Sequence, residues 1–187
     1  MRPSDYVVRH AVRWVVASAL AIACTVAAAQ PRYGLPPEIS AVFNRWVLAT
    51  CIGDEERALI DDLRRYRVPL AVAFQRAIVD GPSPRELREA RAAASERYDA
   101  RAKFPLGEFR VEGVSQEELE RFRRVSRQQY VDDQVRRFAT GYRSNAVAGL
   151  GIVAGPASRE RLARIANNQN DPLAPAAREA LKAAERQ

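Results

Sequence analysis

Acidic residues are the first candidates for chemistry in this sequence, because a pair of carboxylates is enough to hydrolyse a glycosidic bond. They are clustered at Asp54-Glu55-Glu56, Asp61-Asp62 and Asp132-Asp133. Adjacent residues on a helix point about 100° apart, so none of these clusters is built as a facing pair. Solvated helix faces are the simpler interpretation, and a carboxylate-dependent hydrolase of the cell envelope stays open as the alternative function.

The small number of histidines and cysteines limits the kinds of active site that this chain can form. The single histidine is His10, and the two cysteines are Cys24 and Cys51. If the first 29 residues are removed, the remaining chain has no histidine and one cysteine, which excludes the usual Ser-His and Cys-His nucleophilic systems, the common catalytic zinc sites and an intramolecular disulfide. No glycine-rich phosphate loop and no haem-attachment motif is present. We therefore expect no catalytic residue, cofactor or metal, and a buried inert thiol at Cys51, with a redox or partner-linking thiol as the alternative.

The N-terminal segment has the pattern of an export signal. Basic residues come first, at Arg2, Arg9, His10 and Arg13. Residues 14–29 carry no charge and end on Ala27-Ala28-Ala29, the small-x-small pattern that signal peptidase accepts. Such a run spans about 24 Å, less than the ~30 Å hydrocarbon core of a bilayer. We predict cleavage before Gln30 and a periplasmic or secreted protein; a retained inner-membrane anchor and lipidation at Cys24 are the alternatives.

The chain is basic, with 30 Lys and Arg against 23 Asp and Glu and a net charge of +7. Its Arg and Glu residues alternate along the predicted helices, which is typical of solvated faces. Contact with an anionic surface through arginine stays open. Neither nucleic-acid binding nor stable membrane insertion after signal cleavage is expected.

Apolar residues recur at helical spacing through most of residues 36–184, which predicts an all-α fold of antiparallel helical hairpins. Helix ends are predicted at Gly53, at a turn around Pro69 and at Asp80-Gly81-Pro82, and Asp54 is a candidate N-cap. The apolar stripes of the first three helices are Ile39, Val42, Phe43, Trp46, Val47 and Thr50; Leu59, Ile60, Leu63 and Tyr66; and Leu70, Val72, Ala73, Phe74, Ala77 and Ile78.

Two Ser-x-x-Glu capping boxes open later helices. The first, at residues 83–86, begins a polar helix to about Ala102, with a narrow seam of Leu87, Ala90, Ala94 and Tyr98. The second, at residues 115–118, begins what we expect to be the longest helix, ending near Phe138. The segment between these helices is broken by Pro105, Gly107 and Gly113, and a short strand is allowed only at residues 109–111.

This irregular segment holds the candidate partner contacts, which are the apolar side chains Phe104, Leu106, Phe109 and Val111. It either packs onto the core or stays exposed as a contact, since loops and exposed apolar patches carry interfaces. Replacing Phe109 by Ala distinguishes these two possibilities, because loss of a buried ring lowers the free energy of unfolding by about 3–5 kcal/mol. If the segment is structural, we expect the partner surface on the arginine-bearing faces of residues 85–101 and 121–137.

A repeat-like pattern occupies the C-terminal residues. Ala146-x-x-x-Leu150 recurs as Ala177-x-x-x-Leu181 with an offset of 31 residues. Between the two copies lie a helix that we expect Ser158 to cap and the polar turn Asn170-Asp171-Pro172. The pattern resembles a HEAT-type repeat, in which a small-residue helix ends in Leu-Gly, a second helix follows, and Asp-Pro precedes an Arg-x-Ala-x-x-Ala-Leu helix. The resemblance covers about residues 144–184 and implies a short solenoid that binds protein; an irregular helical bundle is the alternative.

These observations predict one helical domain over residues 30–187, with its HEAT-like part at residues 144–187. The expected function is non-catalytic binding or scaffolding of a protein partner in the bacterial envelope. A concave groove without convergent acids would favour this function. A pocket that holds two convergent carboxylates would favour the hydrolase.

Overall fold

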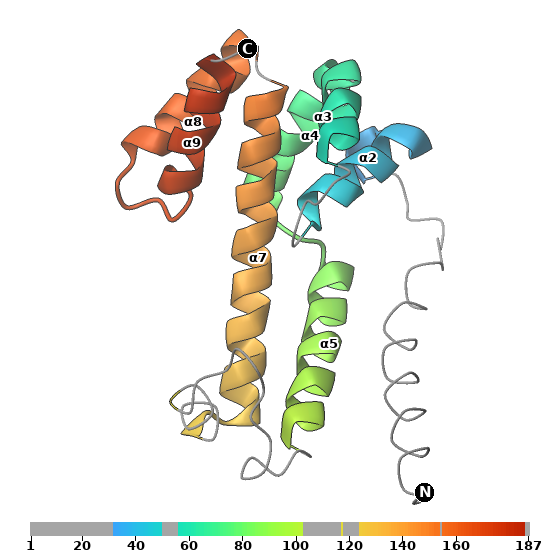
Figure 1. Cartoon of the computed structure of the whole chain (residues 1–187), viewed down its shortest axis with the longest axis vertical. Helices are drawn as coiled ribbons and strands as arrows, with labels where there is room; N and C mark the ends of the chain where they lie inside the picture. Colours follow the sequence, from blue (N-terminus) through green and yellow to red (C-terminus); the bar gives the residue numbers. More distant parts are fainter. Residues whose placement is uncertain (1–31, 50–55, 103–116, 118–123, 154, 186–187) are drawn as a thin grey trace, which may run out of the picture. The chain divides into compact units, whose positions relative to one another are not determined.

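The computed structural model describes residues 32–49, 56–102, 117, 124–153 and 155–185, and every long element in these ranges is a helix. After a 3-10 turn η2 (Arg32–Gly34), the helices are α2 (Pro37–Val47), α3 (Glu56–Arg65), α4 (Arg67–Asp80), α5 (Pro84–Ala102), α7 (Arg127–Ile152), α8 (Pro156–Asn167) and α9 (Ala174–Glu185) (Figure 1). The all-α prediction is confirmed. None of the described helices has the length and apolarity that a membrane span requires.

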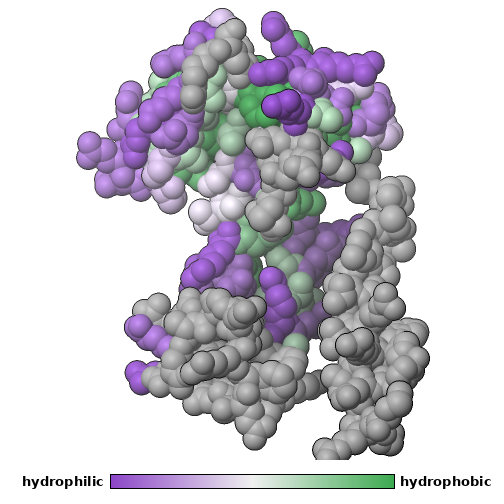
Figure 2. Space-filling view, in the orientation of Figure 1, coloured by the Kyte–Doolittle hydropathy of each residue, from purple (hydrophilic) through white to green (hydrophobic). Residues whose placement is uncertain are grey.

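Helix α7 is the central element of the fold. Its 26 residues extend for about 39 Å, and helices α2, α4, α5, α8 and α9 all pack against it. Its C-terminal half contributes Tyr142, Ala146, Val147 and Leu150 to the main hydrophobic core. Its N-terminal half runs beside α5 as a two-helix arm (Figure 1), and the described surface of this arm is mostly hydrophilic (Figure 2).

Helix α7 has small residues at the points where α4 and α9 pack closely against it. The rings of Phe43 and Phe74 meet with centroids 5.3 Å apart, and a Cβ atom at Gly149 would come within 2.5 Å of the Phe74 ring. A Cβ atom at Gly151 would come within 2.8 Å of the Ala180 Cβ atom and carbonyl oxygen in α9. The small-residue run of the sequence therefore lets α4 and α9 approach α7 at short distance.

The C-terminal end of α2 is fixed to α7 by hydrogen bonds in both directions. The Trp46 indole donates to the carbonyl oxygen of Asn145 at 2.6 Å. The Asn145 amide donates to the carbonyl oxygens of Val47 at 3.2 Å and Ala49 at 2.8 Å. These carbonyls lie at the end of a helix, where no further turn satisfies them, so Asn145 acts as a C-terminal cap supplied by another helix.

Several helix boundaries agree with the sequence prediction. Helix α4 ends at Asp80, and Gly81 follows with φ 68°, a conformation that suits glycine. The capping box at α5 is present, because the Ser83 backbone N–H donates to the Glu86 carboxylate and the Glu86 N–H donates to the Ser83 hydroxyl. Pro69 was predicted to lie in a turn, but it is the third residue of α4. The break between α3 and α4 lies at Tyr66. Proline is tolerated there because the first turn of a helix needs no N–H donor.

The predicted extent of the longest helix is wrong. Val125 and Ser126 are not helical, so no single helix runs from residue 115 to Phe138. Ser126 and Gln129 form the capping box that opens α7, and α7 then continues to Ile152 because no proline interrupts the small apolar run. Helix α8 begins at Pro156 with Gly155 as N-cap, whereas Ser158 is a buried residue inside its first turn.

Helices α8 and α9 form a hairpin in which each helix caps the other. Arg178 of α9 donates to the carbonyl oxygen of Ala166 near the end of α8, at 3.2 Å. Arg159 of α8 donates to the carbonyl oxygen of Ala184 near the end of α9, at 3.1 Å. This hairpin and the end of α7 occupy the residues of the HEAT-like pattern, and the assignment of that pattern to a HEAT solenoid stays a prediction.

Candidate functional site

The predicted partner contacts lie outside the described residues, so the structure does not test them. This applies to Phe104, Leu106, Phe109 and Val111, to the proposed strand at residues 109–111, and to Cys51 and Asp54. The candidate site is therefore sought among the helices, beginning with the acidic residues that the sequence singles out.

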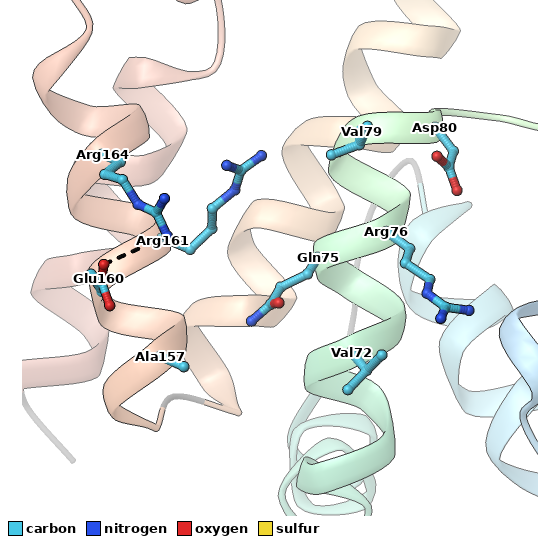
Figure 3. Close-up of a pocket in the computed structure, with 9 residues that line it drawn as sticks. All are labelled: Val72, Gln75, Arg76, Val79, Asp80, Ala157, Glu160, Arg161 and Arg164. Atoms are coloured by element: carbon cyan, nitrogen blue, oxygen red, sulfur yellow. Dashed lines mark ion pairs between the residues drawn. The ribbon is translucent and has the colours of Figure 1, made fainter.

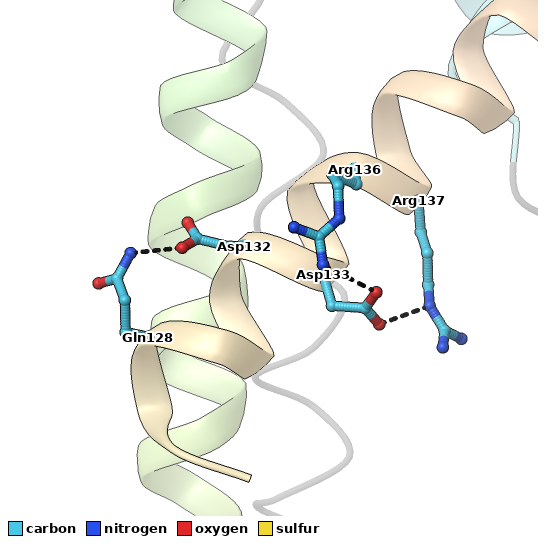
Figure 4. A network of polar contacts seen from close by, with 5 residues as sticks. All are labelled: Gln128, Asp132, Asp133, Arg136 and Arg137. Carbon is cyan, nitrogen blue, oxygen red and sulfur yellow. Dashed lines mark hydrogen bonds and ion pairs between the residues drawn. The ribbon is translucent and has the colours of Figure 1, made fainter.

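The adjacent acids Asp132 and Asp133 lie on α7 and point apart (Figure 4). Asp132 accepts hydrogen bonds from Gln128 at 2.7 Å and from Arg91 of α5 at 2.9 Å. Asp133 pairs with Arg137 at 2.8 Å and with Arg136 at 3.5 Å. The Gln128 amide, followed by the Arg91 guanidinium, lowers the pKa of Asp132. A general acid needs a raised pKa, so this pair is arranged for ion pairing instead.

Several arginines of the α5–α7 arm also form ion pairs with neighbouring carboxylates. Arg127 donates two hydrogen bonds of 2.8 Å to the carboxylate of Asp99, and Arg85 pairs with Glu89 at 2.8 Å. Both contacts raise the pKa of the arginine, first through the hydrogen bond and then through the charge. These arginine-bearing faces were the second expected partner surface, and much of their charge is already neutralised within the arm.

A more open surface lies between α4 and α8. We name it the α4–α8 furrow and define it by Val72, Gln75 and Val79 of α4, Ala157 and Arg161 of α8, and Thr140 and Arg143 of α7. It consists of a cavity of about 510 Å³ and an adjoining cavity of about 330 Å³, which share Val79 and Arg161. Figure 3 shows Val79 and Gln75 facing α8 while Arg161 reaches from α8 into the space between the helices.

Helix α4 exposes three valines along one face, and two of them, Val72 and Val79, line the furrow together with the polar residues Gln75, Arg76 and Asp80. Val68, Val72 and Val79 expose 72%, 51% and 63% of their surface. Their spacing of four and seven residues places them on one face of the helix, opposite the buried Leu70, Phe74 and Ala77. The sequence assigned Val72 to the core stripe, which is wrong. Isolated exposed valines are common, but three along one helix face form a patch of the kind found at binding sites.

The furrow's two cavities are lined by charges of both signs, with four arginines (Arg76, Arg143, Arg161 and Arg164) and three acids (Asp80, Glu160 and Asp171). Glu160 is 3.7 Å from Arg164, and the Asp171 carboxylate accepts the Leu173 backbone N–H at 2.8 Å. Arg161 and Arg143 have no carboxylate partner among the described residues. Arg143 instead lies against Gly81, where a Cβ atom would come within 2.5 Å of its Nη2 atom. The guanidinium groups of Arg161 and Arg143 and the carboxylate of Asp80 thus lie beside the exposed valines.

No pair of acids converges in the described part of this furrow. Asp80 and Glu160 both line the larger cavity, but they come from different helices and point away from one another (Figure 3). Among the described residues, no group of three or more histidine, cysteine or acidic side chains is arranged to hold a metal ion. The described furrow therefore lacks the facing pair of carboxyl groups that glycoside hydrolysis needs.

Sequence reasoning missed the furrow although α4 carries a signal for it. The helix is apolar round most of its circumference, with valines on the side opposite its core stripe. A helix that is hydrophobic all round is buried or serves an interface. Comparison of the chain with protein-family models, curated proteins and solved structures finds no match, so the functional argument depends on this geometry.

Proposed function

We propose that this protein is an exported, non-catalytic helical module that binds a protein partner in the bacterial envelope through the α4–α8 furrow. The observation that carries the proposal is the pair Val72 and Val79, exposed along one wall of a cavity whose other wall supplies Arg161. Exposed apolar residues in a concave surface rimmed by polar groups favour protein association.

The alternative, a carboxylate-dependent hydrolase, receives less support from the acidic residues. Asp132 and Asp133 diverge and are bound by arginines, and Asp61 is 3.6 Å from Arg64 on an exposed face. A hydrolase needs two carboxyl groups that face a common substrate, at roughly 5–9.5 Å from each other. The described furrow offers Asp80 and Glu160 in divergent orientations.

The HEAT-like pattern fits the same proposal. We interpret the end of α7 with the α8–α9 hairpin as one repeat unit, since Gly151 meets Ala180 closely and Arg159 and Arg178 close the hairpin. Stacked helical hairpins present concave binding surfaces. One wall of the furrow is α8 of this unit.

Capture from an envelope fraction tests the proposal. Immobilised protein should retain a discrete partner that the double variant Val72→Asp, Val79→Asp no longer retains, because two charges would be placed in the apolar wall. The matched control is Arg88→Glu, a charge change at an exposed residue of α5. Both variants should keep the wild-type circular dichroism spectrum. Equal capture by the two variants would contradict a role for the furrow.

The proposed export requires a separate test, because binding at the furrow does not depend on whether the protein is periplasmic, secreted or membrane-anchored. N-terminal sequencing of the protein from its native host should give Gln30 as the first residue. An intact Met1 terminus in the membrane fraction would instead support the retained anchor.

A further inference from the structure

We propose that the α5–α7 arm is hinged on the rest of the molecule at two glycines, Gly81 in the connection between α4 and α5 and Gly141 inside α7. The arm comprises α5 and residues 127–140 of α7, and the body that carries it comprises α2, α3, α4, α8, α9 and residues 142–152 of α7. The hinge is a conformational device of the fold and does not depend on the binding function proposed above.

The main hydrophobic core ends at these two glycines. In α7 the first residue of the core is Tyr142, directly after Gly141, and in α4 the last is Ile78, three residues before Gly81. The two glycines also lie near the same level of the molecule, because a Cβ atom at Gly81 would come within 2.5 Å of the guanidinium of Arg143. Both described chain segments that lead from the core into the arm therefore carry a glycine at the point where they leave it.

Packing does not explain the glycine at position 141. Gly149 and Gly151 of the same helix lie against Phe74 and Ala180, where an added Cβ atom would collide. Gly141 is exposed, and an added Cβ atom there would meet nothing within 4 Å. Glycine inside a helix weakens it relative to alanine. Helix α7 is therefore weakened locally, without a gain in packing, at the position where it leaves the core.

Gly81 is the corresponding joint in the other segment. Its φ of 68° and ψ of −161° lie in a region of backbone space that is open essentially to glycine alone. Only residues 81–83 separate the end of α4 from the start of α5, so a change in the direction of α5 must be absorbed there. Hinges in proteins are commonly a few residues at the ends of such elements.

The arm is built to move as one unit, because its ion pairs join its own two helices. Arg91 of α5 pairs with Asp132 of α7 at 2.9 Å. Arg127 of α7 pairs with Asp99 of α5 at 2.8 Å. In the described part of the chain, α7 is the only helix against which α5 packs extensively. A change in the direction of the arm would therefore leave these contacts intact and alter the backbone at the two glycines.

Pulsed electron paramagnetic resonance between two spin labels tests the hinge in the full chain with its native cysteines replaced by serine. The arm-to-body pair is Ala100→Cys of α5 with Ala58→Cys of α3, and the pair within the body is Ala58→Cys with Arg164→Cys of α8; all three positions are exposed. We expect a broader distance distribution for the arm-to-body pair. Gly141→Ala should narrow that distribution and leave the distribution within the body unchanged.

Hydrogen exchange along α7, corrected for intrinsic rates, distinguishes a hinge from an arm that frays. Because bending opens the helical hydrogen bonds beside Gly141, a hinge predicts that amides 141–145 exchange faster than those around Val131 and those around Leu150. Fraying predicts protection that rises steadily from Val131 to Leu150. Gly141→Ala should slow exchange of amides 141–145 about fivefold, which corresponds to about 1 kcal/mol of helix propensity.

The matched control is Gly155→Ala, where an added Cβ atom also meets nothing within 4 Å but the residue is the N-cap of α8, outside both connections to the arm. It should leave the arm-to-body distribution unchanged. The hinge is wrong if the two wild-type distributions are equally narrow, if Gly141→Ala does not narrow the arm-to-body distribution, or if protection rises steadily along α7. None of these variants alters Val72 or Val79, so the binding function is tested separately.

Discussion

The ring of Phe74 lies against the bare Cα of Gly149, and this contact sets how closely α4 approaches α7. A Cβ atom at Gly149 would come within 2.5 Å of one ring carbon and 2.8 Å of two others, and the ring is fully buried. Helix α4 carries the exposed valines on its other side. The position of α4, which forms one wall of the furrow, is therefore set by a glycine of α7.

Substitution of Gly149 by Ala should destabilise the protein by about 1–3 kcal/mol, the usual cost of forcing an added group into a packed core. Chemical denaturation monitored by circular dichroism measures the loss. The matched control is Gly141→Ala in the same helix, where an added Cβ atom meets nothing within 4 Å. That control should be neutral or stabilising by up to about 1 kcal/mol, because alanine favours helix over glycine. Equal effects of the two substitutions would contradict the packing argument.

Asn145 should contribute stability as the external cap of α2. Substitution by Ala removes both bonds from its amide to the Val47 and Ala49 carbonyls, while the bond from Trp46 to the Asn145 backbone can remain. We expect a loss of about 1–2 kcal/mol, since partly buried acceptors lose their donor. The neighbouring change Ser144→Ala should stay within about 0.5 kcal/mol. Thermal melts of both variants compare them, and a silent Asn145→Ala would show that water satisfies these carbonyls.

The α5–α7 arm should lose structure before the core as the pH falls. The pKa of Asp132 is lowered in the folded protein by Gln128 and then by Arg91. A lowered folded pKa means that the ionised carboxylate contributes stability above its unfolded pKa of about 3.9 and that this contribution disappears as the pH falls through the folded value. Hydrogen exchange, corrected for intrinsic rates, should show weaker protection of the arm at pH 3 than at pH 7.

The control for this prediction is Asp132→Asn at pH 7, which should reproduce part of the low-pH loss in the arm and leave amides around Leu150 unchanged. The effect is expected to be small because the pair is exposed. An arm that stays as protected as the core at pH 3 would show that Ala94, Val131 and the Tyr98–Tyr130 ring contact hold it without the charges.

Local signals predicted much of the fold. The stripes of α2 and α3 and the Ser83–Glu86 capping box depend on spacing within one turn or two, and they appear in the predicted helices. The predicted end of the first helix at Gly53 is wrong, because α2 ends at Val47 and Ala49 is no longer helical. The extent of α7 depended on tertiary contacts. Gly149 and Gly151 weaken a helix locally, yet both lie inside α7 because Phe74 and Ala180 fill the space beside them.

The candidate site was harder to predict than the fold. A periodic stripe shows that Leu70, Phe74 and Ala77 share a face, but it does not show whether the opposite face of α4 meets another helix. Val72 was assigned to the core for that reason. The furrow arises because α4 and α8, which are distant in sequence, both pack against α7. Such an arrangement cannot be predicted from a short sequence motif.

Site-specific photo-crosslinking tests the central claim most directly, because it asks whether the furrow touches another protein in the envelope. A photoreactive amino acid at Val79, which is 63% exposed, should yield one discrete protein adduct when the native host is irradiated. The same amino acid at the exposed Arg88 of α5 should yield none. An adduct at Val79 that disappears with Val72→Asp is the result that the proposed function predicts; no adduct at Val79, or the same adducts from both positions, would contradict it.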